Sequence, residues 1–141
     1  MTDAPSKSDA PKSEHQSLRV LVADDNPSSR IALRAKLAEF AFEVIAEAAD
    51  THEAAELFLR HNPDILVVAA GFPPHGGFEL LQYAKQTSPR CILILTTAAA
   101  NPFVEKTGRL LGATEVCPLN DQFKKLGEIL SRLRSMPPGR P

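Results

Sequence analysis

The chain has 141 residues, with 16 basic and 17 acidic side chains and a formal net charge of −1. This length suits one domain with a real hydrophobic core. The balanced charge argues against nonspecific nucleic-acid binding and against an electrostatic membrane anchor, because both need a basic surface. No apolar run approaches the roughly 20 residues that cross a bilayer, and residues 1–17 contain no hydrophobic signal core. The sequence therefore predicts a cytoplasmic protein.

The two ends of the chain differ in composition from its middle. Residues 1–17 are rich in Ser, Pro, Lys and Asp and nearly lack large apolar side chains, so we expect a disordered N-terminal tail. Residues 135–141, "SMPPGRP", contain prolines that end a helix and little that can pack beyond it, so we expect a flexible C-terminal tail. A single domain is therefore predicted over residues 18–134.

Short apolar runs alternate with helical patterns between these ends. Residues 18–23, 65–70 and 91–95 are nearly continuous hydrophobic runs, as in parallel strands that are buried on both faces. Residues 43–48 alternate between apolar and polar side chains, which indicates an edge strand. Residues 113–117 form a weaker fifth strand, which we expect at the other edge.

The helices predicted between these strands begin with recognisable signals. Asn26 and Asn101 each stand before a proline in a pattern typical of a helix start, and Asp50 with Glu53 resembles a capping box. Five β–α units result, which imply an α/β fold with a parallel sheet and helices on both faces. Apolar residues recur at helical spacing in the last predicted helix: Phe123, Leu126, Leu130 and Leu133.

Two of the predicted strand ends differ sharply in chemistry. The strand at 65–70 ends in "VVAA" and offers no polar side chain at the edge where open α/β sheets bind ligands. The first strand ends in Asp24 and Asp25. Their loop lacks the glycines of a nucleotide phosphate site, and such carboxylates suit a hard cation such as Mg²⁺. Taken alone, the pair is better explained by helix capping and turn formation.

The whole pattern is more specific than any one part. The stretches "RVLVADDNPSSRIALRAKL", "EVIAEAADTHEAAELFLRHNPDILVV", "FPPHGGFELL", "ILILTTA" and "LGATEVCPLN" resemble, in order and spacing, the receiver domain of bacterial two-component response regulators. The resemblance covers about residues 18–134. It implies a flavodoxin-like, doubly wound α/β fold whose five-stranded parallel sheet has the strand order 2-1-3-4-5.

The resemblance also implies where phosphorylation chemistry would take place. In that family an Asp at the end of the third strand accepts a phosphoryl group from a histidine kinase and holds Mg²⁺ together with the acidic pair. A Thr or Ser that ends the fourth strand and a Lys after the fifth contact the phosphoryl group. An aromatic residue on the fifth strand transmits the conformational change caused by phosphorylation to the outer surface. The family's loop proline and glycine match Pro73 and Gly77.

Three positions depart from that family pattern. Ala69 stands at the phosphoacceptor position, Leu119 at the lysine position and Val116 at the aromatic position. Alanine has no oxygen to attack phosphorus or to bind a metal, so acyl-phosphate chemistry at residue 69 is excluded. Leucine removes the cation that would balance phosphoryl charge. The positions that match are the acidic pair and the hydroxyl: Asp24, Asp25 and Thr96, or Thr97 if the register slips.

These departures favour a pseudo-receiver, which is a non-enzymatic signalling adaptor that acts through protein partners independently of phosphorylation and without a cofactor. The alternative is a sensor that binds a small molecule or a metal in the vacated pocket near Asp24, Ala69 and Thr96. Weak residual Mg²⁺ binding by Asp24 and Asp25 stays open beside a purely structural role. An FMN enzyme is disfavoured because the first loop is acidic. Direct nucleic-acid binding is disfavoured because no helix-turn-helix pattern follows.

The fourth predicted helix, "NPFVEKTGRLLGA", carries a candidate partner surface. One helical stripe, with Val104, Gly108 and Leu111, should pack on the sheet. A partner protein or a second copy of the chain could cover the other stripe. The resemblance implies the same face, made by helix 4, strand 5 and helix 5. The competing interpretation is a helix that buries both stripes. The second stripe consists of Phe103, Thr107 and Leu110.

Overall fold

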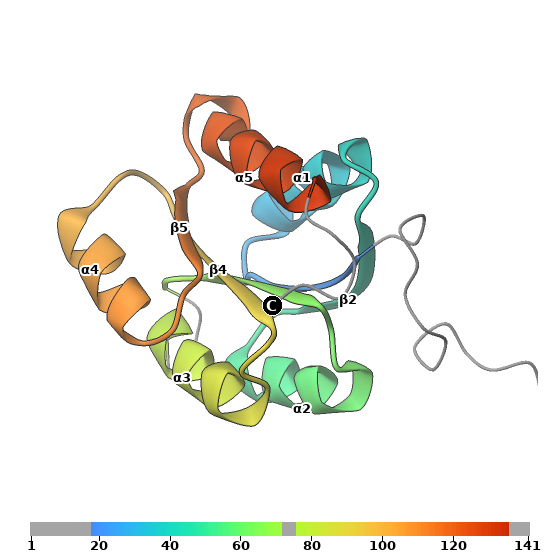
Figure 1. Ribbon diagram of the computed structural model, residues 1–141, viewed down its shortest axis with the longest axis vertical. Coiled ribbons are helices and arrows are strands. Elements are labelled where there is room, and N and C mark those ends of the chain that lie inside the picture. The colour runs from blue at the N-terminus through green and yellow to red at the C-terminus, as the bar shows by residue number, and fades with distance from the viewer. Residues whose placement is uncertain (1–17, 72–75, 136–141) are drawn as a thin grey trace, which may run out of the picture.

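A five-stranded parallel sheet with helices on both faces forms the domain (Figure 1). The computed structural model describes residues 18–71 and 76–135. The strand order is β2-β1-β3-β4-β5, which confirms the predicted α/β fold, the flavodoxin-like topology and the order 2-1-3-4-5. The strands are β1 (Arg19–Ala23), β2 (Glu43–Ala48), β3 (Ile65–Ala69), β4 (Ile92–Thr97) and β5 (Glu115–Pro118).

The helices follow the strands in regular alternation. No helix in the described part of the chain is long and apolar enough to cross a membrane. The predicted tails, except Ser135, and the loop residue Pro73 lie outside the described residues, so those expectations stay predictions. The helices are α1 (Pro27–Glu39), α2 (Thr51–His61), α3 (Gly77–Thr87), α4 (Pro102–Leu110) and α5 (Lys124–Arg134), and a short 3-10 turn, η1 (Asp121–Phe123), precedes α5.

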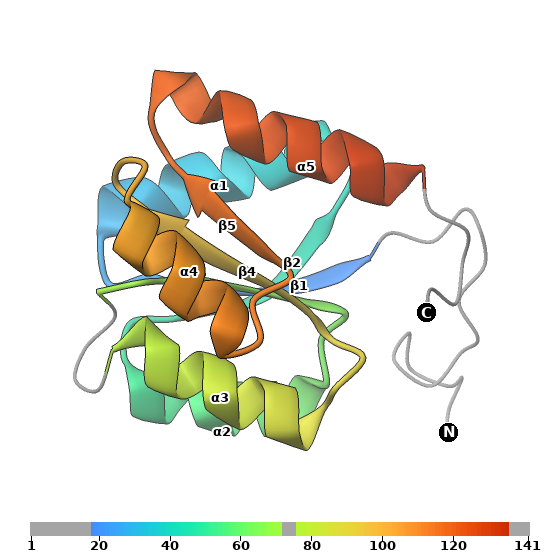
Figure 2. The ribbon, with the colours of Figure 1, turned by 60° about the vertical axis from the view of Figure 1, so that its left-hand side comes forward.

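Each face of the sheet has its own hydrophobic core. The helices α1 and α5 cover one face, whereas α2, α3 and α4 cover the other (Figure 2). Strands β1, β3 and β4 lie inside the sheet and are almost fully buried, because helices cover both of their faces. Strand β2 is only partly buried and lies at one edge, as its alternating sequence predicts, and β5 forms the other edge.

Side-chain caps fix the starts of three helices. The Oδ1 atom of Asn26 accepts hydrogen bonds from the first-turn N–H groups of α1 at 2.9 and 3.2 Å. Asn101 does the same at α4, with the same two distances. At α2, Asp50 accepts from the Glu53 N–H at 2.9 Å, while the Glu53 carboxylate reaches back to the Ala49 N–H at 2.9 Å. The predicted helix starts are therefore confirmed.

The start of α5 differs from the sequence prediction. The apolar spacing placed Phe123 in the last helix, but the helix begins at Lys124. Phe123 has a φ of 63°, in the left-handed region, and stands before the helix without a side-chain cap. Phe123 does pack against the same core as Leu126 and Leu130, so the predicted stripe is confirmed, but its place in the helix was wrong. Spacing records which side chains share a face and not the handedness of the backbone between them.

Candidate functional site

The carboxyl ends of β1, β3 and β4 bring the predicted site residues together at one edge of the sheet. The strand register places Ala69 opposite Thr96 and Ala23 opposite Val68, so the acidic pair that follows β1 lies beside the end of β3. This pairing selects Thr96, rather than Thr97, as the hydroxyl residue next to position 69. An alanine therefore occupies the centre of the edge where this fold places its ligands.

Asp24 is the buried member of the acidic pair. Its exposed fraction is 4%, and its Oδ1 atom accepts a hydrogen bond of 2.9 Å from the Asn26 N–H. Burial raises the pKa of the Asp24 carboxyl above its ordinary value, and the hydrogen bond from Asn26 opposes that shift. Because the carboxyl is more acidic in the unfolded chain, its ionisation lowers the free energy of unfolding as the pH rises through its titration. Asp25 is exposed.

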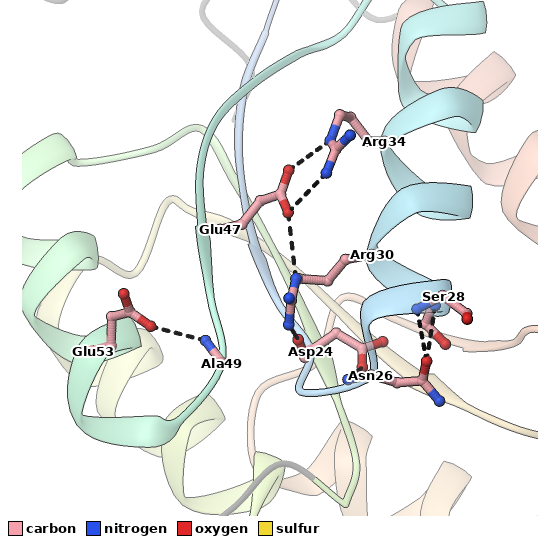
Figure 3. A network of polar contacts seen from close by, with 9 residues as sticks. Asp24, Asn26, Ser28, Arg30, Arg34, Glu47, Ala49 and Glu53 are labelled. Carbon is pink, nitrogen blue, oxygen red and sulfur yellow. Dashed lines mark hydrogen bonds and ion pairs between the residues drawn. The ribbon is translucent and has the colours of Figure 1, made fainter.

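A network of two arginines and one glutamate ties α1 to the acidic loop and to β2 (Figure 3). The Arg30 guanidinium donates to the Asp24 backbone carbonyl at 2.7 Å and lies 3.4 Å from the Glu47 carboxylate. Arg34 donates to both Glu47 oxygens, at 2.7 and 3.3 Å. Sequence reasoning missed this network. The four-residue spacing of the arginines indicates one helix face, but nothing local points to Glu47 as their partner.

The hydroxyl groups at the end of β4 bond to backbone rather than to each other. Thr96 has an exposed fraction of 1%, and its hydroxyl donates to the Val68 carbonyl of β3 at 3.5 Å. Thr97 is half-buried, and its hydroxyl donates to the Ala99 carbonyl at 3.3 Å. The Thr96 hydroxyl therefore lies against β3 directly beside Ala69.

Two positions that depart from the receiver pattern, one in β5 and one directly after it, are apolar and pack against the hydrophobic cores. Val116 has an exposed fraction of 4% and faces Gly108 of α4. Leu119 packs against the core beneath α1 and α5, and its N–H donates to the Thr97 carbonyl at 2.8 Å. The lysine position therefore presents no cation, and the aromatic position holds a small, buried side chain.

The residues present do not fit the magnesium site that the resemblance implies. Residue 69 supplies no oxygen from its side chain, and Asp24 already accepts a backbone hydrogen bond. Within residues 18–71 and 76–135 no group of three or more His, Cys, Asp or Glu side chains could hold a metal ion. Two adjacent carboxylates remain, and one of them is buried.

The second candidate surface lies on α4. Phe103 and Leu110 have exposed fractions of 69% and 76%, whereas Thr107 is half-buried. Gly108 is buried, and a Cβ atom at this position would lie 2.6 Å from Leu95 Cδ2, so the α4 backbone packs directly on the sheet. Gly108 therefore packs on the sheet and Phe103 and Leu110 are exposed, whereas Leu111 caps the helix and is half-buried. That a partner covers Phe103 and Leu110 stays a prediction.

Comparisons with known proteins agree with this architecture. Residues 20–118 match the family model described as the response regulator receiver domain. The transcriptional regulatory protein PdtaR of Mycobacterium tuberculosis is 26% identical over 121 residues, and the match covers 84% of this chain and 59% of PdtaR. The protein CcdB of Bacillus subtilis is 29% identical over 115 residues, which cover 82% of this chain and 96% of CcdB.

A solved receiver structure shows the same relationship in three dimensions. The receiver domain of AraT from Geobacillus stearothermophilus superimposes with a TM-score of 0.74 and 31% sequence identity, over 83% of this chain and 92% of that one. The family model spans the described strands from β1 to β5, including the edge that carries Asp24, Ala69 and Thr96. The chain therefore belongs to the response regulator receiver domain family.

Proposed function

We propose that this receiver domain works without phosphorylation, as a non-enzymatic signalling adaptor that binds protein partners. The observation that carries the proposal is Ala69, which ends β3 at the centre of the C-terminal edge and has no side-chain oxygen. A phosphoryl group transferred to a receiver needs a carboxylate nucleophile there, and a methyl group supplies neither an electron pair nor a metal ligand.

Two further residues support this proposal independently of Ala69. Leu119 contributes its side chain to a hydrophobic core at the position where a cation would balance phosphoryl charge. Val116 is buried next to Gly108 of α4. An aromatic side chain at this position would carry a conformational change from the sheet edge to the surface. The nucleophile, the charge partner and the reporting side chain are therefore all replaced by aliphatic groups.

The wild-type chain should gain no phosphoryl adduct when it is incubated with acetyl phosphate and MgCl₂. Intact-mass spectrometry measures this directly, because one phosphoryl group adds about 80 Da. An ordinary receiver domain, treated in parallel, shows that the reagent is active. A wild-type adduct of about 80 Da would reveal another acceptor and would contradict phosphorylation independence.

The partner surface that we propose spans α4, β5 and α5. The exposed side chains of Phe103 and Leu110 provide apolar anchors on α4. A chain of ion pairs lies beside them. The Arg109 guanidinium contacts Glu105 at 2.6 Å and Glu115 at 3.6 Å. Glu115 in turn lies 3.3 Å from Arg132 of α5. Apolar anchors bordered by charged groups on three adjoining elements are typical of protein interfaces.

Leu110→Glu should weaken partner binding or self-association at least tenfold while the domain stays folded. The Leu110 side chain is 76% exposed, so the substitution leaves the core intact, but it places a charge in the proposed contact. Sedimentation velocity measures self-association, and titration with a purified partner measures heterologous binding.

Leu59→Glu on α2 is the matched control, because Leu59 is 61% exposed and lies outside the proposed surface. Equal melting temperatures for the two variants, with a loss of association only in Leu110→Glu, would support the surface. Association that is unchanged in Leu110→Glu, or that falls equally in both variants, would place the contact elsewhere.

A further inference from the structure

A left-handed turn connects β5 to α5. Asp121, Gln122 and Phe123 have φ angles of 53°, 54° and 63°. Residues other than glycine seldom adopt this conformation, and then usually one at a time, because their Cβ atom comes too close to the following carbonyl oxygen. Three consecutive residues therefore store backbone strain next to the candidate site.

Contacts on both sides hold the turn in this form. The Leu119 N–H donates to the Thr97 carbonyl at 2.8 Å and fixes the chain to the end of β4. Within the turn, the Phe123 N–H donates to the Asn120 carbonyl at 3.0 Å. A strained backbone persists only where the surrounding structure determines it from several directions. Beyond the turn, α5 buries Leu126, Ile129, Leu130 and Leu133.

The amino-acid sequence of the turn favours the opposite handedness. Asn26 and Asn101 cap α1 and α4 through their side chains, whereas Asn120 makes no such bond. In a right-handed continuation of α5, Asn120 would stand at the N-cap and Asp121 in the first turn, where an acidic side chain is favourable. Phe123 packs against the core beneath α1 and α5 in the left-handed form, and a right-handed helix would place it on the same buried face, three residues before Leu126.

We propose that residues 120–123 form a two-state turn. One state is the left-handed form described above, and the other is a right-handed form in which α5 begins at Asp121 and Asn120 is its cap. The turn starts after Leu119 at the candidate site and ends at α5 of the proposed partner surface. A change between the two states would therefore alter the start of α5 at that surface. The existence of the two states does not depend on the proposed function, whereas this consequence for partner binding rests on it.

Gln122 is the position that tests the strain, because its side chain is exposed and a substitution there acts mainly on the backbone. Gln122→Gly should raise the melting temperature by about 3 °C, since glycine adopts positive φ without strain. Lys125→Gly, at an exposed position of the right-handed α5, is the matched control. It should lower the melting temperature, because glycine is unfavourable in a right-handed helix. A Gln122→Gly variant that melts at or below the wild-type temperature would overturn the proposal.

Gln122→Val tests the second state, because a β-branched side chain strongly disfavours positive φ. We expect Cα chemical shifts of residues 121–123 to become helical in this variant. In the wild type Asn120 makes no cap bond, so Asn120→Ala should leave the melting temperature unchanged. In the Gln122→Val background the same change should lower it by about 3 °C. The two-state turn would be overturned if Asn120→Ala changed the melting temperature equally in both backgrounds. It would also be overturned if the Cα chemical shifts of residues 121–123 in Gln122→Val stayed as in the wild type.

Discussion

Gly77→Ala should destabilise the domain by about 3 kcal/mol, which is a large fraction of the stability of a domain of this size. A Cβ atom at residue 77 would clash with the Ala69 carbonyl oxygen and would lie 3.1 Å from Ala70 Cα. Both neighbours belong to the backbone of β3 and the start of its loop, so neither can rotate aside as a side chain would. The Gly77 N–H also donates to the Ala70 carbonyl at 3.0 Å. Relief of the clash would therefore move α3 away from the sheet.

Urea denaturation followed by circular dichroism measures this loss. Gly71→Ala is the matched control in the same connection, because a Cβ at Gly71 would meet no atom within 4 Å among the described residues. We expect the control to stay within about 0.5 kcal/mol of the wild type. If Gly77→Ala unfolded at the same urea concentration as Gly71→Ala, the close packing of α3 on β3 would not be needed for stability.

The contact at Gly77 also explains why glycine stands at this position of the receiver pattern. The start of α3 packs directly against the carbonyl group of residue 69, which ends the central strand. From the sequence, the importance of Gly77 could be predicted only by similarity to the family, because residue spacing does not show how closely two backbones approach. The structure supplies the physical reason, which is a lack of space for one methyl group.

Much of the fold could be predicted because its signals are local. The continuous apolar runs of β1, β3 and β4 follow from burial on both faces, and the polar alternation of β2 follows from its place at the edge. The caps at Asn26 and Asn101 depend on a side chain and the N–H groups two and three residues later. Such features involve neighbours in sequence, so a short stretch contains all the information needed.

Other features depend on partners that are distant in sequence. Glu47 of β2 joins Arg30 and Arg34 only because β2 pairs with β1 and α1 packs beside both. The raised pKa of Asp24 follows from its burial, which no local pattern of acidic residues records. At Phe123, the attachment of Leu119 to β4 and the packing of α5 together impose a handedness that the local sequence disfavours. Tertiary contacts determine each of these features.

Ala69→Asp should convert the domain into one that is labelled by acetyl phosphate in the presence of MgCl₂. The new carboxylate would end β3 beside the acidic pair, opposite Thr96, and would complete three carboxylates at one edge. Intact-mass spectrometry should show a gain of about 80 Da that is absent without the metal ion. Ala69→Asn, which has the same shape but no nucleophilic oxygen of comparable strength, should gain nothing.

The same substitution should weaken the fold when no divalent ion is present. Burial already raises the pKa of Asp24, and a second carboxylate beside it adds repulsion between like charges. We expect a loss of about 1 to 2 kcal/mol at pH 7, which shrinks as the pH falls and the carboxyls become protonated. MgCl₂ should restore the lost stability of Ala69→Asp and have no such effect on Ala69→Asn. A loss that is independent of pH and of Mg²⁺ would indicate a steric cause instead.

Labelling of Ala69→Asp should nevertheless leave binding at the α4, β5 and α5 surface unchanged. Leu119 offers no cation to attract the phosphoryl group, and Val116 is too small to transmit a displacement to α4. A ligand can shift a conformational equilibrium only through contacts that differ between its two states, and these aliphatic side chains supply none. Equal partner affinity for the labelled and unlabelled variant would show that phosphorylation and surface binding are uncoupled. A change in affinity on labelling would mean that another connection, such as the turn at residues 120–123, links the two.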